Sequence, residues 1–118
     1  MMKVLDLFSG IGGFSLGLER TGGFETVAFC EIDPFCRRVL AKHWPAAERF
    51  DDVRTIRPRA TDIICGGFPC QPFSLAGKQR GLEDERWLWP EFARVIDEAK
   101  PSIVVAENVP GLRARGLR

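Results

Sequence analysis

The amino-acid sequence predicts an α/β fold built on an open, mainly parallel β-sheet. Apolar runs of strand length alternate with helical patterns along the 118 residues. The apolar runs lack polar alternation, as is typical of parallel strands that helices cover on both faces. Glycine-rich or polar segments follow these runs, at the edge where open parallel sheets bind ligands. The length suits one domain with a single hydrophobic core.

The first predicted unit is a strand, a glycine turn and a short helix. Residues 4–8 form an apolar run that ends at the turn of residues 9–13, Ser-Gly-Ile-Gly-Gly. The helix that follows is expected to end near residues 21–23, Thr-Gly-Gly. Residues 25–31 are rich in β-forming side chains and predict the second strand.

The second helix has a clear start signal. Asp33 suits the N-cap position and Pro34 the first helical position. Trp44 and Pro45 are expected to end the helix. Its inner face is predicted to comprise Phe35, Cys36, Val39, Leu40 and His43.

Two strands of different strength come next. Residues 49–56 predict a weak strand and a loop, and residues 61–65 a buried strand. Residues 66–85 have little apolar periodicity and many Gly, Pro, Gln and Ser residues. A loop of about 20 residues between two clear elements is usually functional, and we interpret it so.

The last predicted elements are a helix and a buried strand. Pro90 lies in the first turn of the helix, where proline is tolerated. Residues 102–106 form the apolar strand, which ends at Glu107. The helix buries one stripe made of Leu88, Phe92, Val95, Ile96 and Ala99.

Charge is unevenly distributed along the chain. The net charge is +1, but residues 1–35 carry two basic and five acidic side chains, which leaves the remainder at +4. This pattern fits a cationic ligand in the first part and phosphates near the second, although solvated surface charge explains it equally well.

Composition excludes several classes of protein. No apolar run reaches the length of a membrane span and no signal peptide begins the chain, so we expect a cytoplasmic protein without a membrane partner. The cysteines have no C-x-x-C spacing and His43 is the single histidine, so we expect no metal site. Cys30, Cys36 and Cys65 are interpreted as structural thiols, mostly buried.

The first glycine turn resembles a dinucleotide fingerprint but departs from it. Gly10 and Gly12 fit, whereas Ser15 occupies the third glycine position. Asp6 precedes the turn, and Glu31 ends the second strand, where a carboxylate suits ribose hydroxyls. Acidic surroundings without a full phosphate cradle favour S-adenosylmethionine over NAD. A generic α/β turn is the open alternative.

The long loop contains the most distinctive residue. Cys70 lies between Pro69 and Gln71-Pro72, and the prolines restrict the backbone on either side of the thiol. We therefore interpret Cys70 as a nucleophile. Glu107 at the end of an apolar strand is costly to bury unless it is paired, protonated or functional, and a capping acid is the alternative.

These motifs together resemble those of cytosine-C5 DNA methyltransferases in order and spacing. The matching segments are DLFSGIGGF at residues 6–14, Glu31, GFPCQPFS at 67–74 and ENV at 107–109. The resemblance implies the Rossmann-like sheet of S-adenosylmethionine-dependent methyltransferases. It also implies that residues 1–118 are the N-terminal part of the catalytic domain, with the target-recognition domain absent and the sheet incomplete at its C-terminal side.

The resemblance implies a covalent mechanism. The Cys70 thiolate adds to C6 of a cytosine, Glu107 contacts N3, and C5 takes the methyl group. The target base must leave the stack of double-stranded DNA. The implied cofactor contacts are Phe8, Ser9, Gly10, Gly12, Glu31, Ile32, Asp52, Val53, Pro69 and Leu88, and the implied DNA contacts are Gln71, Ser74, Lys78 and Arg86.

One departure and several alternatives accompany this interpretation. Trp87 stands where the family usually has a small residue, so Leu88 matches its family position only approximately. Lys78 and Arg86 also fit simple solvated charges. The leading hypothesis is a truncated or split enzyme that needs a complementary C-terminal chain, and the alternative is an inactive remnant that binds cofactor or DNA. An NAD-dependent oxidoreductase and a thiol redox protein are disfavoured by the broken fingerprint and by the distance of Cys65 from Cys70.

Overall fold

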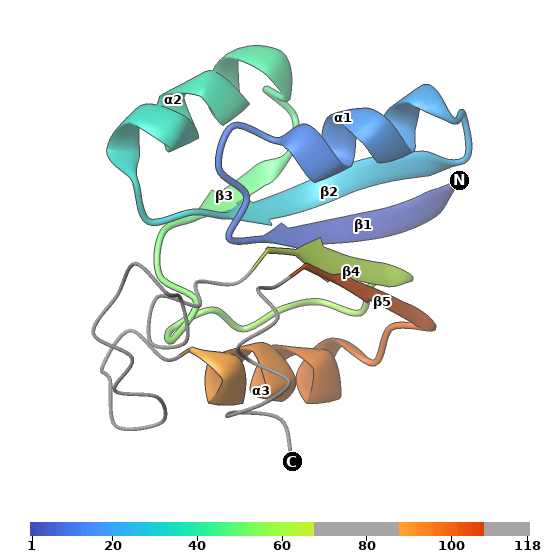
Figure 1. Cartoon of the computed structure of the whole chain (residues 1–118), viewed down its shortest axis with the longest axis vertical. Coiled ribbons are helices and arrows are strands. Elements are labelled where there is room, and N and C mark those ends of the chain that lie inside the picture. The colour runs from blue at the N-terminus through green and yellow to red at the C-terminus, as the bar shows by residue number, and fades with distance from the viewer. Residues whose placement is uncertain (68–87, 108–118) are drawn as a thin grey trace.

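The computed structural model describes residues 1–67 and 88–107. A five-stranded parallel sheet in the order β3-β2-β1-β4-β5 forms its centre. Helices α1 and α2 cover one face and α3 the other (Figure 1). The expected α/β class with an open parallel sheet is confirmed. The elements are β1 (Met2–Leu7), α1 (Gly13–Arg20), β2 (Phe24–Cys30), α2 (Pro34–His43), β3 (Glu48–Phe50), β4 (Ile63–Gly66), α3 (Trp89–Ala99) and β5 (Ile103–Ala106).

Strand β1 is the centre of the sheet and of the core. It pairs with β2 through Leu7 and Cys30 and with β4 through Leu7 and Gly66. The chain runs from β1 outward to β3, then crosses to the other side of β1 to form β4. The strand order therefore reverses at β1, and the carboxyl ends of β1, β2 and β4 lie at one edge. In open α/β sheets this is the place where ligands bind.

Helix α2 begins where the sequence predicts. The Asp33 carboxylate accepts a hydrogen bond from the backbone N–H of Phe35 at 2.8 Å, and Pro34 is the first helical residue. The predicted inner face is only partly right. Leu40 is fully buried with Phe29 and Ala47, but Phe35 is 60% exposed and His43 is exposed. Leu40 and Trp44, near the C-terminal end of the helix, pack against Phe29 of the sheet, whereas Phe35 in the first turn is exposed.

Helix α3 packs as its apolar stripe predicts. Phe92, Val95 and Ala99 are fully buried in the core that contains Leu5 and Ile64 of the sheet. Leu88 and Ile96 pack against the same core. Pro90 occupies the first turn, where its missing N–H leaves no helical hydrogen bond broken.

Strand β5 differs from its prediction. It pairs with β4 as expected, but Ile103, Val104 and Val105 are 46%, 40% and 38% exposed. The prediction that this apolar run is buried on both faces is wrong. β5 is the last strand in the sheet order, and none of its residues belongs to the buried core clusters of the described chain. An edge position of this kind leaves aliphatic side chains accessible.

Two further observations concern the predicted protein class. Among residues 1–67 and 88–107, no helix combines the length and apolar character needed to cross a membrane. Cys30 and Cys65 are buried, as expected, whereas Cys36 is only half-buried. Burial raises the pKa of the Cys30 thiol to about 12, which fits a structural thiol rather than a nucleophile.

Candidate cofactor and catalytic site

The turn after β1 is built from residues with left-handed backbone conformation. Phe8, Gly10 and Gly12 have φ angles of 52°, 57° and 94°. Glycine adopts this region without a steric cost, whereas a bulky residue such as Phe8 is strained there. The Phe8 ring stacks on Phe92 of α3, with centroids 6.1 Å apart and planes inclined by 7°. Packing against α3 therefore helps to hold the strained turn.

Gly12 is required by its surroundings as well as by its backbone. A Cβ atom at this position would lie 2.6 Å from the Trp44 ring and 3.1 Å from Leu40. The Trp44 indole is itself held, since its N–H donates to the Glu19 carboxylate at 2.8 Å. The sequence interpretation assigned Trp44 only the end of a helix. The structure adds that the Trp44 ring closes the space behind the glycine turn.

Ser9 faces the protein interior. Its hydroxyl donates to the backbone carbonyl of Asp6 at 2.5 Å and lies 3.3 Å from that of Cys30. The side chain is buried, and its backbone N–H also bonds Cys30 O at 3.2 Å. Ser9 therefore joins the ends of β1 and β2, with its hydroxyl proton directed toward these carbonyls.

Asp6 is a fully buried carboxylic acid beneath the same turn. One oxygen accepts from the Ser15 hydroxyl at 2.6 Å, and Ser15 accepts in turn from the Thr26 hydroxyl at 2.7 Å. No N–H or O–H group of the described chain reaches the other oxygen. Burial raises the pKa of Asp6 to about 6, against the hydrogen bonds of Ser15, which lower it. Its pairing partner in β4 is Cys65, whose thiol pKa burial also raises.

Glu31 connects the second strand to the glycine turn. One carboxylate oxygen accepts from the backbone N–H of Gly10 at 2.7 Å, and the other accepts from that of Asp33 at 2.8 Å. Each oxygen retains capacity for a further hydrogen bond, because a carboxylate offers about four acceptor sites. The neighbouring Ile32 is 65% exposed at the same edge. A hydroxyl-bearing group with a flat apolar surface fits this pair of side chains.

The turn after β3 contains Asp52 and Val53. Arg54 pairs with the Asp52 carboxylate, with Nη2 to Oδ2 at 2.9 Å and Nε to Oδ1 at 3.0 Å. The hydrogen bonds from Arg54 hold the pKa of Asp52 below its ordinary value. The Val53 side chain is buried in the main core, together with Leu88 at its margin. The backbone at Asp52 and Val53 therefore lies at the carboxyl edge of β3, and the buried Val53 side chain holds it against the core.

The catalytic half is only partly within the described residues. Cys70 and its predicted neighbours Pro69, Gln71, Ser74, Lys78 and Arg86 lie outside them. Glu107 is described, and its backbone N–H bonds Gly66 O at 3.1 Å. Its side chain is exposed, because β5 is itself uncovered, so no burial cost applies to this carboxylate. The start of the predicted catalytic loop and Glu107 nevertheless lie side by side.

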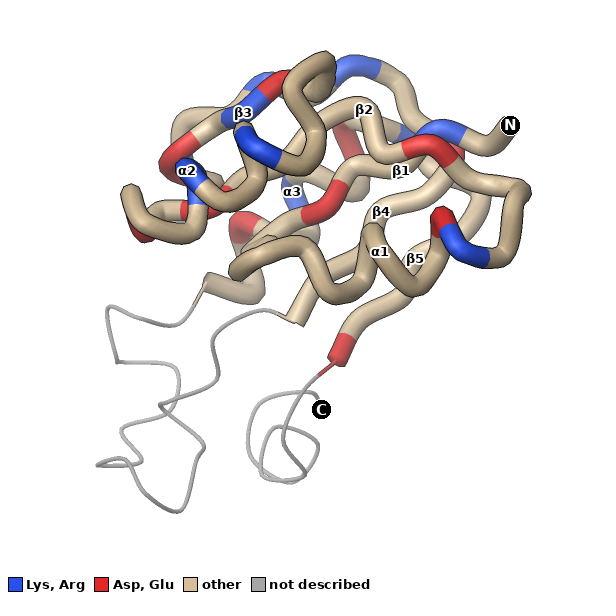
Figure 2. The backbone as a smooth tube through the Cα atoms, turned by 90° about the horizontal axis from the view of Figure 1, so that it is seen from above, with Lys and Arg blue, Asp and Glu red and all other residues tan. Residues whose placement is uncertain are grey.

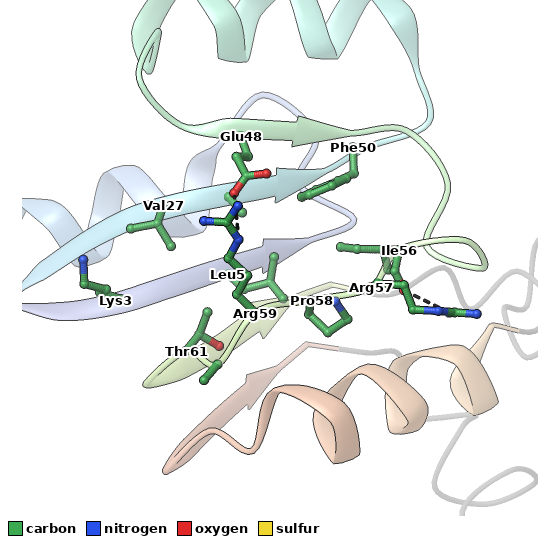
Figure 3. Close-up of a pocket in the computed structure, with 12 residues that line it drawn as sticks. Lys3, Leu5, Val27, Glu48, Phe50, Ile56, Arg57, Pro58, Arg59 and Thr61 are labelled. Carbon is green, nitrogen blue, oxygen red and sulfur yellow. Dashed lines mark hydrogen bonds and ion pairs between the residues drawn. The ribbon is translucent and has the colours of Figure 1, made fainter.

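A separate pocket of about 370 Å³ lies on the face that α3 covers (Figure 3). Its lining includes Lys3 near the start of β1, Thr61 just before β4, and Phe50 at the end of β3. Its rim contains Arg59, 87% exposed and 3.8 Å from Glu48. Such exposed charges hold a ligand weakly, and we do not include this pocket in the candidate site.

Neither charged patches nor metal-binding clusters mark a second site in residues 1–67 and 88–107. Figure 2 shows acidic and basic residues mixed along the described backbone. Several residues of the predicted basic half lie outside that part of the chain. In the residues that the structure describes, no group of three His, Cys, Asp or Glu side chains could hold a metal ion.

Comparisons with known proteins agree with this geometry. The family model for C-5 cytosine-specific DNA methylases matches residues 2–116. The chain is 41% identical to the type II methyltransferase M.HgiBI of Herpetosiphon aurantiacus, covering 93% of this chain and 26% of that protein. It is 44% identical to M.Eco47II of Escherichia coli, covering 92% and 27%.

A solved structure of a methyltransferase is also similar to this chain. An Escherichia coli prophage protein described as a DNA modification methyltransferase superposes with a TM-score of 0.77 at 34% identity, over 95% of this chain and 33% of that one. The chain thus spans about a quarter to a third of the length of the proteins it matches. From the family match over nearly the whole sequence, the chain belongs to the C-5 cytosine-specific DNA methylase family.

Proposed function

We propose that the chain forms the cofactor-binding and nucleophile-bearing part of a DNA cytosine-C5 methyltransferase that uses S-adenosylmethionine. The observation that carries the proposal is the arrangement of Glu31 against Gly10 at the point where the strand order reverses. An acceptor carboxylate beside a glycine turn suits an adenosyl ribose, and the exposed Ile32 suits the adenine ring.

The residues present fit this cofactor. When bound, S-adenosylmethionine supplies an electrophilic methyl group. Phe8, Gly10 and Gly12 would line its methionine portion through their backbone, since no side chain projects from the two glycines. Glu31 would accept from the ribose hydroxyls. The adenine would contact Ile32, with Asp52, Val53 and Leu88 at its edge.

The proposed chemistry rests on Cys70 and Glu107. The Cys70 thiolate forms a bond to C6 of a cytosine flipped out of double-stranded DNA, and the electron pair of the C5–C6 double bond becomes available at C5. Glu107 hydrogen-bonds or protonates N3, which limits negative charge on the ring. C5 would take the methyl group, with S-adenosylhomocysteine as the other product. A base then removes the C5 proton, the C5–C6 double bond re-forms, and the C6–S bond breaks to return the Cys70 thiolate. Gln71, Ser74, Lys78 and Arg86 are the proposed DNA contacts, and Pro69 the further proposed cofactor contact.

We also propose that the protein acts in the cytoplasm. Its activity would require the C-terminal portion of a methyltransferase, supplied by a complementary chain. Two observations support this. The chain spans 26% and 27% of the two curated relatives named above. The aliphatic side chains of β5 are exposed at the sheet edge, where a further strand can pair.

Ligand binding by the chain tests the cofactor assignment. Isothermal titration with S-adenosylhomocysteine and with NADH should give saturable heat for the first ligand only. Glu31→Gln should weaken binding about 10-fold, because an amide NH₂ cannot accept from the ribose or from a backbone N–H. Glu25→Gln alters an exposed carboxylate on the same strand and should leave binding unchanged. Saturable binding of NADH without S-adenosylhomocysteine would contradict the proposal.

A further inference from the structure

Arg94 joins helix α3 to the turn that follows β3. Its Nη2 donates to the backbone carbonyl of Val53 at 2.7 Å, and its Nη1 donates to that of Ile56 at 3.1 Å. The contacts cross 41 and 38 residues of sequence, so they are tertiary and not local. One guanidinium therefore holds both ends of a four-residue segment.

The other side of the guanidinium is fixed by its own helix. Arg94 Nε bonds Glu91 at 3.0 Å, and Nη1 bonds Glu98 at 2.7 Å. Because a guanidinium is planar, these two carboxylates determine the direction in which its remaining N–H groups point. The arginine thus reaches the turn with its orientation already set, which lowers the entropic cost of holding the two carbonyls.

The turn also has hydrogen bonds within itself. Thr55 N–H bonds Asp52 O at 3.0 Å, and Arg54 pairs with Asp52 within the same turn. These bonds tie the segment to itself. Among the described residues, the buried Val53 and Ile56 side chains and the two carbonyls that Arg94 holds connect the segment to the rest of the protein.

We infer that Arg94 is a positioning residue for adenine recognition, acting through the backbone of Val53. The inference rests on the proposed function, in which Asp52 and Val53 contact the adenine edge. Backbone groups discriminate between bases only when they are held in register with them, and a shift of about 1 Å is enough to lose a hydrogen bond. Arg94 touches no proposed ligand atom itself.

If Arg94 had a purely structural role, its loss would destabilise the fold without changing the ligand preference. Helix α3 is anchored by Phe92, Val95 and Ala99, all fully buried, so its packing does not depend on Arg94. Loss of the guanidinium should leave the fold intact and loosen the turn. Arg94→Lys retains the charge but cannot bond both carbonyls in the fixed geometry of the guanidinium. Its ligand affinity and preference should therefore lie between those of the unaltered chain and of Arg94→Ala.

The test compares two ligands that differ at the adenine edge. S-adenosylhomocysteine and S-inosylhomocysteine would be titrated into the unaltered chain, Arg94→Ala, Arg94→Lys and the control Asp97→Asn, with thermal unfolding recorded for each. We expect Arg94→Ala to bind S-adenosylhomocysteine about 10-fold more weakly and to lose most of its preference over the inosyl compound. Asp97→Asn, which removes an exposed carboxyl of α3 and leaves Glu91, Glu98 and both carbonyl contacts of Arg94 in place, should retain affinity and preference.

The outcomes separate the possible failures. An unchanged ligand preference in a folded Arg94→Ala chain would overturn the positioning role, whatever its unfolding temperature. Failure of the unaltered chain to bind S-adenosylhomocysteine would refute the proposed cofactor site and the inference with it. Hydrogen exchange provides a second readout without ligand, since the Thr55 N–H should exchange faster in Arg94→Ala than in Asp97→Asn.

Discussion

The buried Asp6 carboxyl should make the stability of the chain depend on pH in an unusual direction. The residue is fully buried beneath the glycine turn and has one oxygen without an N–H or O–H partner in the described chain. Most carboxyl groups stabilise a fold in the ionised form. Asp6 should do the opposite, because burial raises its pKa from 3.8 to about 6.

The sign and size of the pH dependence of stability follow from that pKa shift. Between about pH 4 and pH 6 the folded state holds a proton on Asp6 that the unfolded state has lost, so stability falls as pH rises through this window. The difference of about two pKa units corresponds to about 3 kcal/mol. This contribution is fully present below about pH 4 and lost above about pH 6. Asp6→Asn keeps an oxygen for the Ser15 hydroxyl and does not ionise.

Urea unfolding at intervals from pH 4 to pH 8 measures the effect. The free energy of unfolding of the unaltered chain minus that of Asp6→Asn should fall by about 3 kcal/mol from pH 4 to pH 7. Taking the difference removes the contributions of the other titrating groups. Asp97→Asn, which removes an exposed carboxyl of α3, controls for the loss of one negative charge. A difference that stays constant across this range would refute the reasoning.

Three further substitutions test the site in different ways. Gly12→Ala should lower the free energy of unfolding by about 3 kcal/mol, because of left-handed backbone strain and the contact with the Trp44 ring. Gly13→Ala, where a Cβ meets open space, should lower it little. Equal losses for the two variants in urea unfolding would contradict this account. Trp44→Phe should cost about 2 kcal/mol, because the Glu19 carboxylate loses an indole donor, and an unfolding midpoint equal to that of the unaltered chain would count against it. Ile32→Ser should leave the free energy of unfolding nearly unchanged, because the side chain is 65% exposed. It should weaken the binding of S-adenosylhomocysteine about 10-fold in titration calorimetry, because the exposed side chain is available to adenine. Unchanged affinity would remove Ile32 from the site.

Local sequence signals predicted the elements well. The Asp33-Pro34 pair predicted the start of α2, and its capping hydrogen bond is present. The spacing of Phe92, Val95 and Ala99 predicted the buried stripe of α3. These signals succeed because capping and helical periodicity depend on neighbours in the sequence.

Predictions that depended on tertiary cover were less accurate. The apolar composition of β5 suggested burial, but whether a strand is covered depends on its place in the sheet order. Phe35 is as apolar as Leu40, yet only Leu40 lies over the sheet. Periodicity identifies a possible inner face without saying how much of the helix length is in contact.

Some features of the site had no recognisable signal in the sequence. Arg94 appears as an ordinary helical charge with Glu98 four residues later, a spacing typical of a solvated ion pair. Its bonds to Val53 and Ile56 arise only when α3 packs beside the β3 turn. The ring of Trp44 behind Gly12 is likewise a consequence of the fold, although the glycine itself was identified from the turn pattern.

Transfer of a labelled methyl group to cytosine-containing DNA tests the central claim most directly. The chain would be assayed alone and mixed with the C-terminal portion of a homologous methyltransferase. The proposal predicts no turnover by the chain alone, turnover in the mixture, and loss of that turnover on Cys70→Ser. Methyl transfer that survives Cys70→Ser, or full activity of the chain without a partner, would contradict it.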